Sequence, residues 1–324
     1  MKAILAREFG GPHVLKLEDV ADPSAGPGQV RVRVHAVGVN PYDTYMRSGG
    51  YAINPPLPYT PGADAAGVVD QVGDGVSGVA VGDRVYVGGT AQARAYGAYA
   101  AMVVCQPGQV HPLPARVSFA QGAGVNVPYV TAWAALFVRA QARPGDTLFI
   151  HGASGGVGVA ATQLARAAGL TVIGSAGSDE GLALVTAQGA HHAVNHRREG
   201  YLDEVKALTG GKGPAVIIEM LANVNLDRDL GLAAPGAKIV VVGNRGRVEI
   251  DPRQVMGKGL TVTGMAFWNL PDEEVRRGHA AVGAGLESGA LTPVVGTELP
   301  LGDAAHAHAL VLEPGAKGKI VLVP

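Results

Sequence analysis

The hydrophobic pattern divides the chain into two parts of different texture. From Met1 to about Pro128 the apolar residues alternate with polar ones, as in QVRVRVHAV, where Val30, Val32 and Val34 share one face of a strand. The segment PGADAAGVVDQVGDGVSGVAVGDRVYVGG then repeats short valine runs between Gly-Asp and Asp-Gly turns. This pattern predicts a compact, strongly bent antiparallel sheet or partial barrel that is nearly free of helix.

The pattern after Gly145 is that of buried strands separated by helices. Six apolar runs follow, TLFIHG, LTVIGS, HHAVNH, AVIIEM, KIVVVG and LTVTGMAF, most of them separated by segments with helical periodicity. Such alternation predicts a doubly wound parallel sheet of the α/β class with the strand number of a dinucleotide-binding domain. Beyond about Trp268 we expect a helix in DAAHAHALVLE and a last strand, KIVLVP, that returns to the first part of the chain.

A glycine-rich turn, HGASGGVG, joins the first of these strands to an alanine-rich helix. Glycine spacing alone is weak evidence. In a chain with 48 glycines among 324 residues, a motif with three glycines at fixed spacing is expected about once by chance. The order of strand, turn and helix is what favours a pyrophosphate-binding turn over a turn that only packs helix on sheet. Gly155 then allows close approach of the pyrophosphate, Gly158 allows helix packing, and Ser154 offers a hydroxyl near the helix start.

The identity of the dinucleotide depends on the end of the second strand of this sheet. An NAD site places an acidic residue there, whereas this chain has GSAGS, in which Gly177 and Ser178 leave room for a 2′-phosphate. The run HRR, which begins at His196, can supply donors and positive charge, although it also fits a solvated surface. Asp179 and Glu180 follow closely and either reach the ribose or stabilise a helix start. The pattern favours NADPH.

Composition narrows the class of partner. The chain has 26 basic and 27 acidic residues, so a nucleic-acid partner is unlikely on charge grounds and a small molecule is the expected ligand. The single cysteine, Cys105, excludes an internal disulfide and a thiolate-built metal site. The start MKAILAREFGG lacks the apolar run of a signal peptide, and no later run has the length of a membrane span. We expect a cytoplasmic protein with no membrane contact.

The chain resembles the medium-chain dehydrogenase/reductase superfamily, and within it the zinc-free quinone oxidoreductases of the zeta-crystallin branch. The resemblance covers nearly the whole chain and rests on EFGGPHVLKL, GVNPYDTYMRSG, LPYTPGADAAGVV, VGDRV, HGASGGVG, IIEMLANVNLDRDL, VVGNRG and GKIVLV. It implies a Rossmann doubly wound sheet inserted in a GroES-like β-rich catalytic domain. The implied boundaries are 1–127 for the first part of the catalytic domain, 128–267 for the NADPH-binding domain and 268–324 for the C-terminal part.

The resemblance also implies an activity and the residues that serve it. It implies NADPH-dependent reduction of a quinone held in the interdomain cleft, with Asn40, Tyr45 and Tyr51 as the catalytic residues that border the quinone. Ser178 joins the cofactor residues because it lies in the turn after the second strand. The residues expected to bind the cofactor are Tyr45, Ser154, Gly155, Gly156, Val157, Gly177, Ser178, His196, Asn225, Val242, Gly243, Asn244, Arg245, Met265, Ala266 and Phe267.

The resemblance implies that both metal sites of the zinc enzymes are missing. Those enzymes have a cysteine where this chain has Asn40, a His-Glu pair where it has Ala63 and Asp64, and a four-cysteine lobe that is absent here. Bacterial relatives also bind the 2′-phosphate with a lysine and an arginine at places that hold Gly181 and Pro314, which leaves this contact to His196 and its neighbours. Without zinc as a Lewis acid, alcohol oxidation is disfavoured, whereas a quinone needs only an apolar slot and hydrogen-bond donors.

Other interpretations stay open at this point. The same cleft suits an NADPH-dependent enone or 2-alkenal reductase, and zeta-crystallin relatives also include structural and RNA-binding proteins. Asp43 and Asp64 are candidate acid-base groups, although a loop aspartate and a Gly-Ala-Asp turn are commoner explanations. The family implies a homodimer or homotetramer, in which the apolar strand KIVVVG could pair across a two-fold axis.

Overall fold

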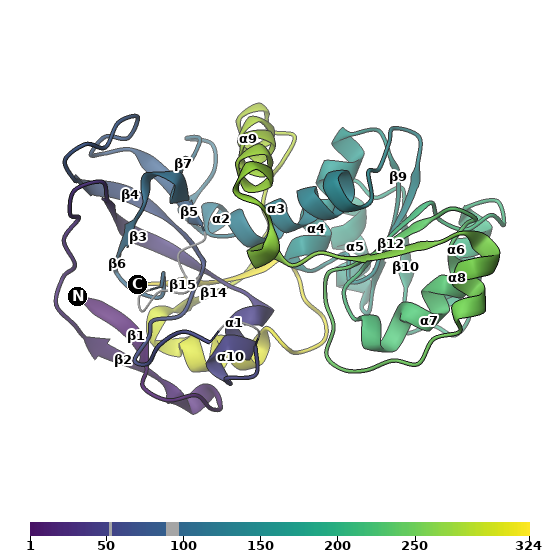
Figure 1. The fold of residues 1–324 in the computed structure, drawn as a ribbon, viewed down its shortest axis with the longest axis horizontal. Coiled ribbons are helices and arrows are strands. Elements are labelled where there is room, and N and C mark those ends of the chain that lie inside the picture. The colour runs from purple at the N-terminus through teal and green to yellow at the C-terminus, as the bar shows by residue number, and fades with distance from the viewer. Residues whose placement is uncertain (52–53, 89–96) are drawn as a thin grey trace. The chain divides into compact units, whose positions relative to one another are not determined.

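The computed structural model describes residues 1–51, 54–88 and 97–324 and divides into two compact units (Figure 1). The terminal unit comprises Met1–Val127, Gly283–Glu313 and Gly318–Pro324. The central unit comprises Pro128–Val282 and Pro314–Lys317. The described helices include none that is both long and apolar enough to cross a bilayer.

The terminal unit is built mainly on antiparallel strands, as the alternating pattern predicts, with one parallel pair, β14 and β15. Its larger sheet has the order β14-β15-β3-β4-β5-β7, with β6 also paired to β3, and a separate ribbon joins β1 to β2. The elements of this unit are β1 (Lys2–Ala6), β2 (Leu15–Asp19), β3 (Val30–Val39), α1 (Pro41–Arg47), β4 (Asp64–Val72), β5 (Arg84–Gly88), β6 (Met102–Cys105), β7 (Val110–Pro112), α2 (Phe119–Gly122), β14 (Val295–Pro300), α10 (Ala304–Leu310) and β15 (Lys319–Val323).

Strand β3 shows how the alternation of residues becomes a core. Val30 and Val32 are fully buried, whereas Arg33 on the opposite face is exposed. The apolar face packs into a cluster with side chains of β5, β6 and α10, and partly buried Ile320 of β15 packs against that cluster. Strand β15 pairs antiparallel with β3, which confirms that the chain end returns to this sheet. Cys105 is buried in β6, in agreement with a packing role.

Two expectations for this unit are wrong. The first part of the chain was expected to be nearly helix-free, yet α1 forms at Pro41–Arg47. Its N-cap is Asn40, whose backbone N–H donates to Asp43 Oδ2 at 2.9 Å, and proline at the first helical position suits the start of a helix. Asp64 lies at the start of β4 rather than in a turn, and its side chain is fully buried.

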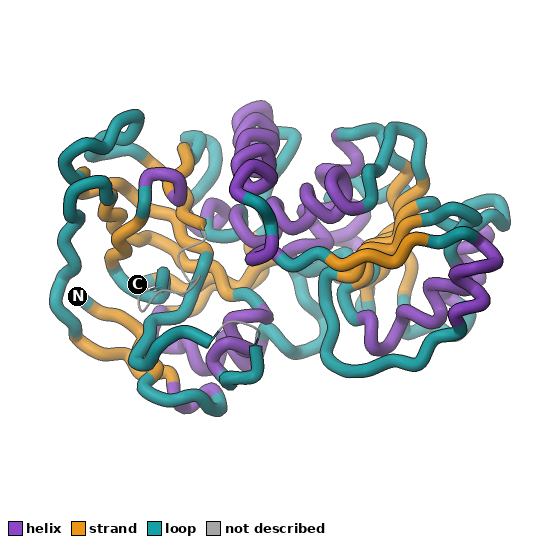
Figure 2. The backbone as a smooth tube through the Cα atoms, in the orientation of Figure 1, coloured by secondary structure: helices purple, strands orange, loops and turns teal. Residues whose placement is uncertain are grey.

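The central unit is a parallel sheet with helical crossovers (Figure 2). The order β10-β9-β8-β11-β12-β13 reverses direction next to β8, which confirms the doubly wound topology, and the six predicted runs form its six strands. The elements are α3 (Asn126–Trp133, beginning in the terminal unit), β8 (Thr147–Ile150), α4 (Gly156–Ala167), β9 (Thr171–Ala176), α5 (Asp179–Ala187), β10 (His192–Asn195), α6 (Tyr201–Leu208), β11 (Val216–Glu219), α7 (Ala222–Leu232), β12 (Lys238–Val241), α8 (Pro252–Lys258), β13 (Thr261–Gly264) and α9 (Asp272–Ser288, ending in the terminal unit).

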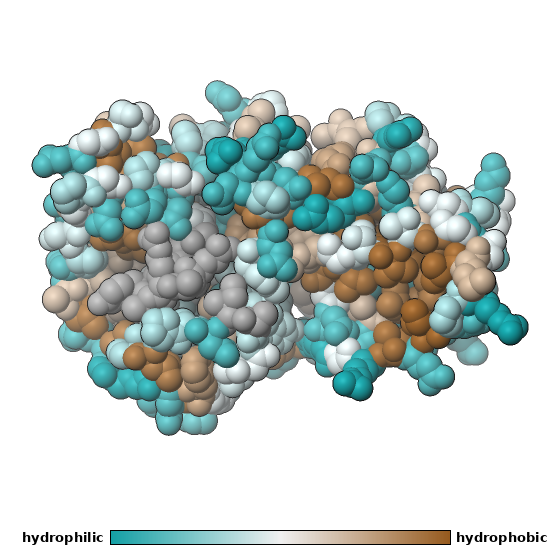
Figure 3. Space-filling view, viewed as in Figure 1, coloured by the Kyte–Doolittle hydropathy of each residue, from teal (hydrophilic) through white to brown (hydrophobic). Residues whose placement is uncertain are grey.

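The edge strands of this sheet are β10 and β13, so β12, the strand that was expected to pair between subunits, is not at an edge. Strand β12, which contains KIVV, is hydrogen-bonded to β11 on one side and to β13 on the other. Its backbone therefore has no free edge for a second chain. Val262 of β13 and Met256 of α8 are exposed. Figure 3 shows hydrophobic residues gathered on one face of the central unit.

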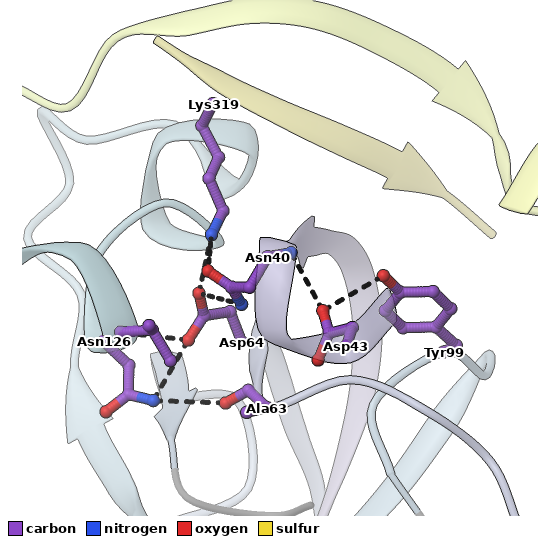
Figure 4. Close-up of polar contacts among 8 residues, drawn as sticks. Asn40, Asp43, Ala63, Asp64, Tyr99, Asn126 and Lys319 are labelled. Carbon is purple, nitrogen blue, oxygen red and sulfur yellow. Dashed lines mark hydrogen bonds and ion pairs between the residues drawn. The ribbon is translucent and has the colours of Figure 1, made fainter. Parts of the chain in front are cut away.

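A buried ion pair holds together four segments of the terminal unit (Figure 4). Lys319 Nζ lies 2.8 Å from Asp64 Oδ2 and also donates to Asn40 Oδ1. Asn40 Nδ2 donates to the same Asp64 oxygen at 3.0 Å, while Asn126 Nδ2 and the backbone N–H of Val127 donate to Asp64 Oδ1 at 3.0 and 2.9 Å. Asp64 therefore accepts four hydrogen bonds, which replace the water lost on burial. We call Asn40, Asp64, Asn126 and Lys319 the ammonium cluster.

A glycine in β3 makes room for the lysine of this cluster. A Cβ atom at Gly38 would lie 2.7 Å from Lys319 Cε and 2.0 Å from the carbonyl oxygen of Ala123. Atoms at such distances overlap, so a larger residue would displace either the lysine stem or the backbone before α3. Glycine at this position thus lets the lysine reach the aspartate.

Replacing Lys319 with methionine should lower the free energy of unfolding by about 3 kcal/mol, because Asp64 would keep a buried negative charge without its cation. Adding Asp64→Asn to this variant should recover part of the loss, since neither charge then remains. Denaturant titration of the three proteins measures these differences.

The exposed pair of Lys2 and Asp19 gives a matched control. Its side chains are 57% and 76% exposed at an Nζ to Oδ2 distance of 2.7 Å, so Lys2→Met should leave stability nearly unchanged. Equal losses for Lys319→Met and Lys2→Met would contradict the role assigned to burial.

Candidate active site

The segments predicted to bind the cofactor all follow the carboxyl ends of the strands in the central unit. Turn 152–158 follows β8, residues 177–178 follow β9, and residue 196 follows β10. Segments 220–225, 242–245 and 265–267 follow β11, β12 and β13 in the same way. Because all six strands are parallel, these segments meet at one edge of the sheet, where open α/β sheets bind their ligands.

The turn after β8 has the form of an anion-binding helix start. Gly155 is the N-cap of α4, and no side chain caps this end of the helix. The first N–H groups of the helix and its positive dipole end are therefore available to a phosphate. A Cβ atom at Gly158 would lie 2.5 Å from Ala153 Cα, so glycine is required for α4 to pack on the turn. The residues thus fit a pyrophosphate.

Two basic side chains cover the glycine after β9. A Cβ atom at Gly177 would lie 2.8 Å from His196 Nε2 and 3.0 Å from Arg197 Nε. Glycine therefore lets the side chains that follow β10 approach the end of β9, which is where the adenosine ribose of a dinucleotide is bound in this fold. Burial, the nearby His151 and Arg197 all lower the pKa of His196, so its imidazole is neutral at pH 7 and donates a single hydrogen bond.

A lysine that sequence reasoning missed lies beside this position. Ser178 caps α5 by accepting the N–H of Gly181 at 3.2 Å, and Glu180 is in the first turn of the helix. Lys317 Nζ lies 3.9 Å from Glu180 Oε2. Residues Pro314–Lys317 belong to the central unit although the chain on both sides belongs to the terminal unit. Lys317 therefore supplies a cation three residues after Pro314, the position at which the resemblance implies that an arginine is missing.

Hydrogen bonds within the protein hold the turns after β11 and β12. Asn225 Nδ2 donates to Glu219 Oε1 at 3.2 Å, and the N–H groups of Val242 and Gly243 donate to the carbonyl of Glu219 at 2.8 and 3.2 Å. A Cβ atom at Gly243 would lie 2.2 Å from the carbonyl oxygen of Met220, so the two turns touch through their backbones. Glu219 is therefore the residue around which both turns are organised.

The remaining predicted cofactor residues lie in the same region of the unit. The backbone N–H of Arg245 donates to Asn223 Oδ1 at 2.9 Å, and Asn244 Nδ2 donates to the carbonyl of Gly246 at 2.8 Å. Met265 is buried at the end of β13 and donates its N–H to the carbonyl of Val241 at 2.9 Å. Ala266 and Phe267 follow and lead into a short 3-10 helix. Ser154, Gly156 and Val157 lie in the turn and first turn of α4.

In the terminal unit the structure brings Tyr45 and Tyr51 together. Their ring centroids are 5.9 Å apart with tilted planes, and Tyr42 stacks on Tyr51 at 6.0 Å. Burial, with nearby Asp43, raises the pKa of Tyr51 well above its ordinary value, so its hydroxyl stays protonated. The group offers aromatic faces together with phenolic hydroxyls.

Asn40 is engaged in the ammonium cluster, and Asp43 in a second buried network. Asn40 is buried, with 3% of the residue exposed, and both its side-chain nitrogen and its side-chain oxygen have partners. Tyr99 donates to Asp43 Oδ2 at 3.3 Å and lies 3.1 Å from His308 Nε2. Burial raises the pKa of Asp43 to about 7, although the backbone N–H of Asn40 and the charge of Lys319 oppose this effect. Asp43 therefore exchanges a proton near neutral pH.

The ammonium cluster does not fit a zinc ion. Asn40 and Asp64 stand where the resemblance places zinc ligands, and both contact Lys319 Nζ. Each oxygen of Asp64 already accepts two hydrogen bonds, and a fixed positive charge repels a metal cation. Ala63 has no ligand atom in its side chain.

No sequence signal identified Lys319 or Asn126 as members of this cluster. Lys319 is 255 residues from Asp64 along the chain, and it follows a glycine in a segment that predicts only a strand. The pairing of β15 with β3 is what brings it to the aspartate.

Comparison with known families assigns both parts of the chain. A model described as zinc-binding dehydrogenase matches residues 156–281, and a model described as alcohol dehydrogenase GroES-like domain matches residues 26–115. Quinone oxidoreductase of Rattus norvegicus is 47% identical over 100% of this chain and 98% of that protein. 2-Haloacrylate reductase of a Burkholderia species is 32% identical over 100% of this chain and 99% of that protein.

Solved structures agree with this assignment. Escherichia coli quinone oxidoreductase, solved with NADPH, matches with a TM-score of 0.86 and 29% identity over the whole of both chains. A structure described as an NAD-dependent alcohol dehydrogenase matches with a TM-score of 0.93 and 33% identity, again over the whole of both chains. The predicted α/β fold with a GroES-like part is confirmed. The chain therefore belongs to the medium-chain dehydrogenase/reductase superfamily and, within it, to the quinone oxidoreductases of the zeta-crystallin type.

Proposed function

We propose that this protein reduces quinones with NADPH and without zinc. Residues 128–267 act as the nucleotide-binding domain, and residues 1–127 with 268–324 act as the catalytic domain. The observation that carries the proposal is the ammonium cluster, in which Lys319 lies between the two residues at the zinc-ligand positions. A fixed cation leaves the family fold without Lewis-acid activation of an alcohol, and a quinone does not require it. Full-length similarity to curated quinone oxidoreductases supports the same substrate class.

The residues of this chain divide the work between two sites. Bound NADPH supplies the reducing equivalents. The free N–H groups at the start of α4 would bind its pyrophosphate, and His196, Arg197 and Lys317 would hold its 2′-phosphate. Tyr45 and Tyr51 offer an aromatic face and hydroxyl donors to the quinone oxygens, and Asn40 holds the start of α1, on which Tyr45 lies.

A second candidate substrate class is an activated carbon-carbon double bond. The similarity to 2-haloacrylate reductase over the whole chain favours it, because an acrylate presents a polarised double bond instead of a quinone. The same tyrosine hydroxyls would then face the carboxylate or carbonyl that withdraws electrons. Substrate turnover separates the two classes.

We also propose that the protein forms a homodimer through β13. This strand is the edge of the central sheet beyond β12, and a second copy pairing with it would extend the sheet. Val262 is 39% exposed and Met256 is 79% exposed, so pairing would also bury apolar surface.

Purified protein given NADPH should reduce a panel of ortho- and para-quinones, measured as loss of the reduced-cofactor absorbance above the uncatalysed rate. Dialysis against EDTA should leave the rate unchanged, because no step needs a metal. Turnover of 2-alkenals or 2-haloacrylates with little response to quinones would select the second class. Loss of activity on chelation that Zn²⁺ restores would contradict zinc independence.

Replacing His196 with alanine should reduce the preference for NADPH over NADH about tenfold, the value of one hydrogen bond to a charged phosphate. Lys317→Ala should act in the same direction but less strongly and more so at low salt, because its side chain is 53% exposed. Fluorescence titration with both cofactors measures the preference.

Lys212→Ala is the matched control for these variants. Lys212 is also exposed, but it follows α6 and precedes the amino end of β11, at the opposite edge of the sheet from the cofactor segments. Its removal should leave both affinities unchanged. An unchanged NADPH preference in His196→Ala and Lys317→Ala would mean that the 2′-phosphate is bound elsewhere.

Replacing Val262 with lysine should convert the dimer into a monomer, because a charge on the free edge opposes strand pairing between copies. Size-exclusion chromatography with light scattering measures the mass. The same change at Val81, which is 65% exposed in the terminal unit, is the control and should leave the mass unchanged. A wild-type protein that is already monomeric would exclude this interface.

A further inference from the structure

A group of three ionisable side chains is buried in the central unit, beneath the segments proposed to bind the cofactor. His151 follows β8 directly, Glu219 ends β11, and Asp229 lies in α7. Their side chains are 5%, 0% and 0% exposed. His151 Nε2 lies 2.8 Å from Asp229 Oδ1 and 3.3 Å from Glu219 Oε2. Three separate segments thus meet through two polar contacts of His151 in the interior of the unit.

The unpaired oxygens of this group require a proton. Glu219 Oε2 and Asp229 Oδ2 are buried and have no hydrogen-bond donor from the described part of the chain. Two ionised carboxylates beside a neutral imidazole would place two negative charges in the interior, which is costly. A proton held by Glu219 and donated to Asp229 removes one charge and satisfies both oxygens. Burial raises the pKa of Glu219 and of Asp229 to about 7, consistent with one carboxyl remaining protonated near neutral pH.

The remaining oxygen of Glu219 connects the group to the cofactor segments. Glu219 Oε1 accepts the backbone N–H of Leu221 and the side-chain amide of Asn225. His151 is the residue immediately before Gly152, which begins the pyrophosphate turn. The position of this turn and the position of Asn225 therefore depend on the same three side chains.

We propose that His151, Glu219 and Asp229 form a positioning network, joined by one shared proton, that holds the pyrophosphate turn and the Asn225 segment in the geometry that binds the dinucleotide. The network positions residues and does not touch the reacting atoms. Its link to cofactor binding rests on the proposed function. The shared proton itself does not, because it follows from burial and contacts in the protein.

A metal ion is the competing explanation of the same residues. The ligand-type atoms of these three residues lie within 4.8 Å of one another, the only such group of His, Cys and carboxylate side chains in the described residues. The contact of 2.8 Å between His151 and Asp229 has the length of a charge-assisted hydrogen bond, and Glu219 Oε1 already accepts two N–H groups. These contacts favour the proton.

Charged and titratable neighbours face the network from the surrounding elements. His196, which follows β10, faces His151, and its own pKa is lowered by burial and by His151. Tyr201 of α6 faces Asp229, which together with burial raises the tyrosine pKa, whereas Arg228 of α7 lowers it. These neighbours are the same in wild type and in a variant at Glu219, so the difference between the two proteins isolates the shared proton.

The test compares wild type with Glu219→Gln and Glu219→Ala. Glutamine keeps an oxygen for Leu221 and Asn225 and offers an N–H to Asp229, so it mimics the protonated acid at every pH. Because the folded protein holds a proton that the unfolded chain releases near pH 4 to 5, wild-type stability should fall as the pH rises toward 7 and stay low above it. The melting temperatures of both proteins are measured without cofactor at pH 5.5 and at pH 8.5. The melting temperature of Glu219→Gln minus that of wild type should be about 3 °C larger at pH 8.5 than at pH 5.5.

NADPH affinity gives the second readout. Wild type should bind NADPH severalfold more weakly at pH 8.5 than at pH 6, and Glu219→Gln should lose less affinity over the same range. Glu219→Ala should bind about tenfold more weakly at both values, because the turn loses its acceptor. Glu204→Gln, an exposed residue on α6, is the control and should follow wild type.

Each outcome decides one part of the proposal. Parallel pH profiles of wild type and Glu219→Gln in both readouts would overturn the shared proton, as would a stoichiometric divalent cation in the purified protein. A shifted melting profile with unchanged NADPH affinity in Glu219→Ala would overturn the positioning role. Failure of wild type to bind NADPH at any pH would instead refute the proposed cofactor, while the melting profiles would still test the proton.

Discussion

Buried charge must be compensated where it lies, and each unit of this protein is organised around one group that meets this requirement. In the terminal unit the ammonium of Lys319 neutralises Asp64, and amide and backbone donors complete its hydrogen bonds. In the central unit, the described basic residues that pair with Glu219 and Asp229 include only the neutral His151, so a shared proton takes the place of a cation there. These contacts fix segments that are far apart in the chain. An unpaired buried charge would cost more free energy than the conformational entropy that is lost when these segments become ordered.

The ammonium cluster is also the observation behind the proposal that this protein works without zinc. The start of β4 and the residue before α1 meet through the hydrogen bond from Asn40 to Asp64. A lysine from the last strand supplies the positive charge at that place. These contacts hold Asn40 before α1, and Tyr42, Tyr45 and Tyr51 follow it closely in the chain as an aromatic group with phenolic hydroxyls.

Periodicity predicted the elements well where local pattern decides structure. The six strands of the central sheet, the helix after the glycine turn and the return of KIVLVP to the first sheet follow from hydrophobic spacing and are confirmed. Helix α1 was missed because its seven residues are too few to show helical spacing, and a cap and a proline start it instead. The expectation that KIVVVG pairs between subunits was wrong, because this strand lies between β11 and β13. Its apolar sequence could not show this, since the strands of a parallel sheet are apolar both inside the sheet and near its edge.

The sequence by itself determined the succession of strands and helices along the chain and the glycine turn between β8 and α4, because these depend on residues that are close together in the chain. Only the tertiary structure decided which side chains complete each group. Lys319 reaches Asp64 across 255 residues, and Lys317 reaches Glu180 because its short segment joins the other unit. Glu219 meets His151 through the pairing of β11 with β8. Such contacts leave no periodic pattern in a sequence. They depend on which strands lie side by side in the sheet and on the need to compensate buried charge.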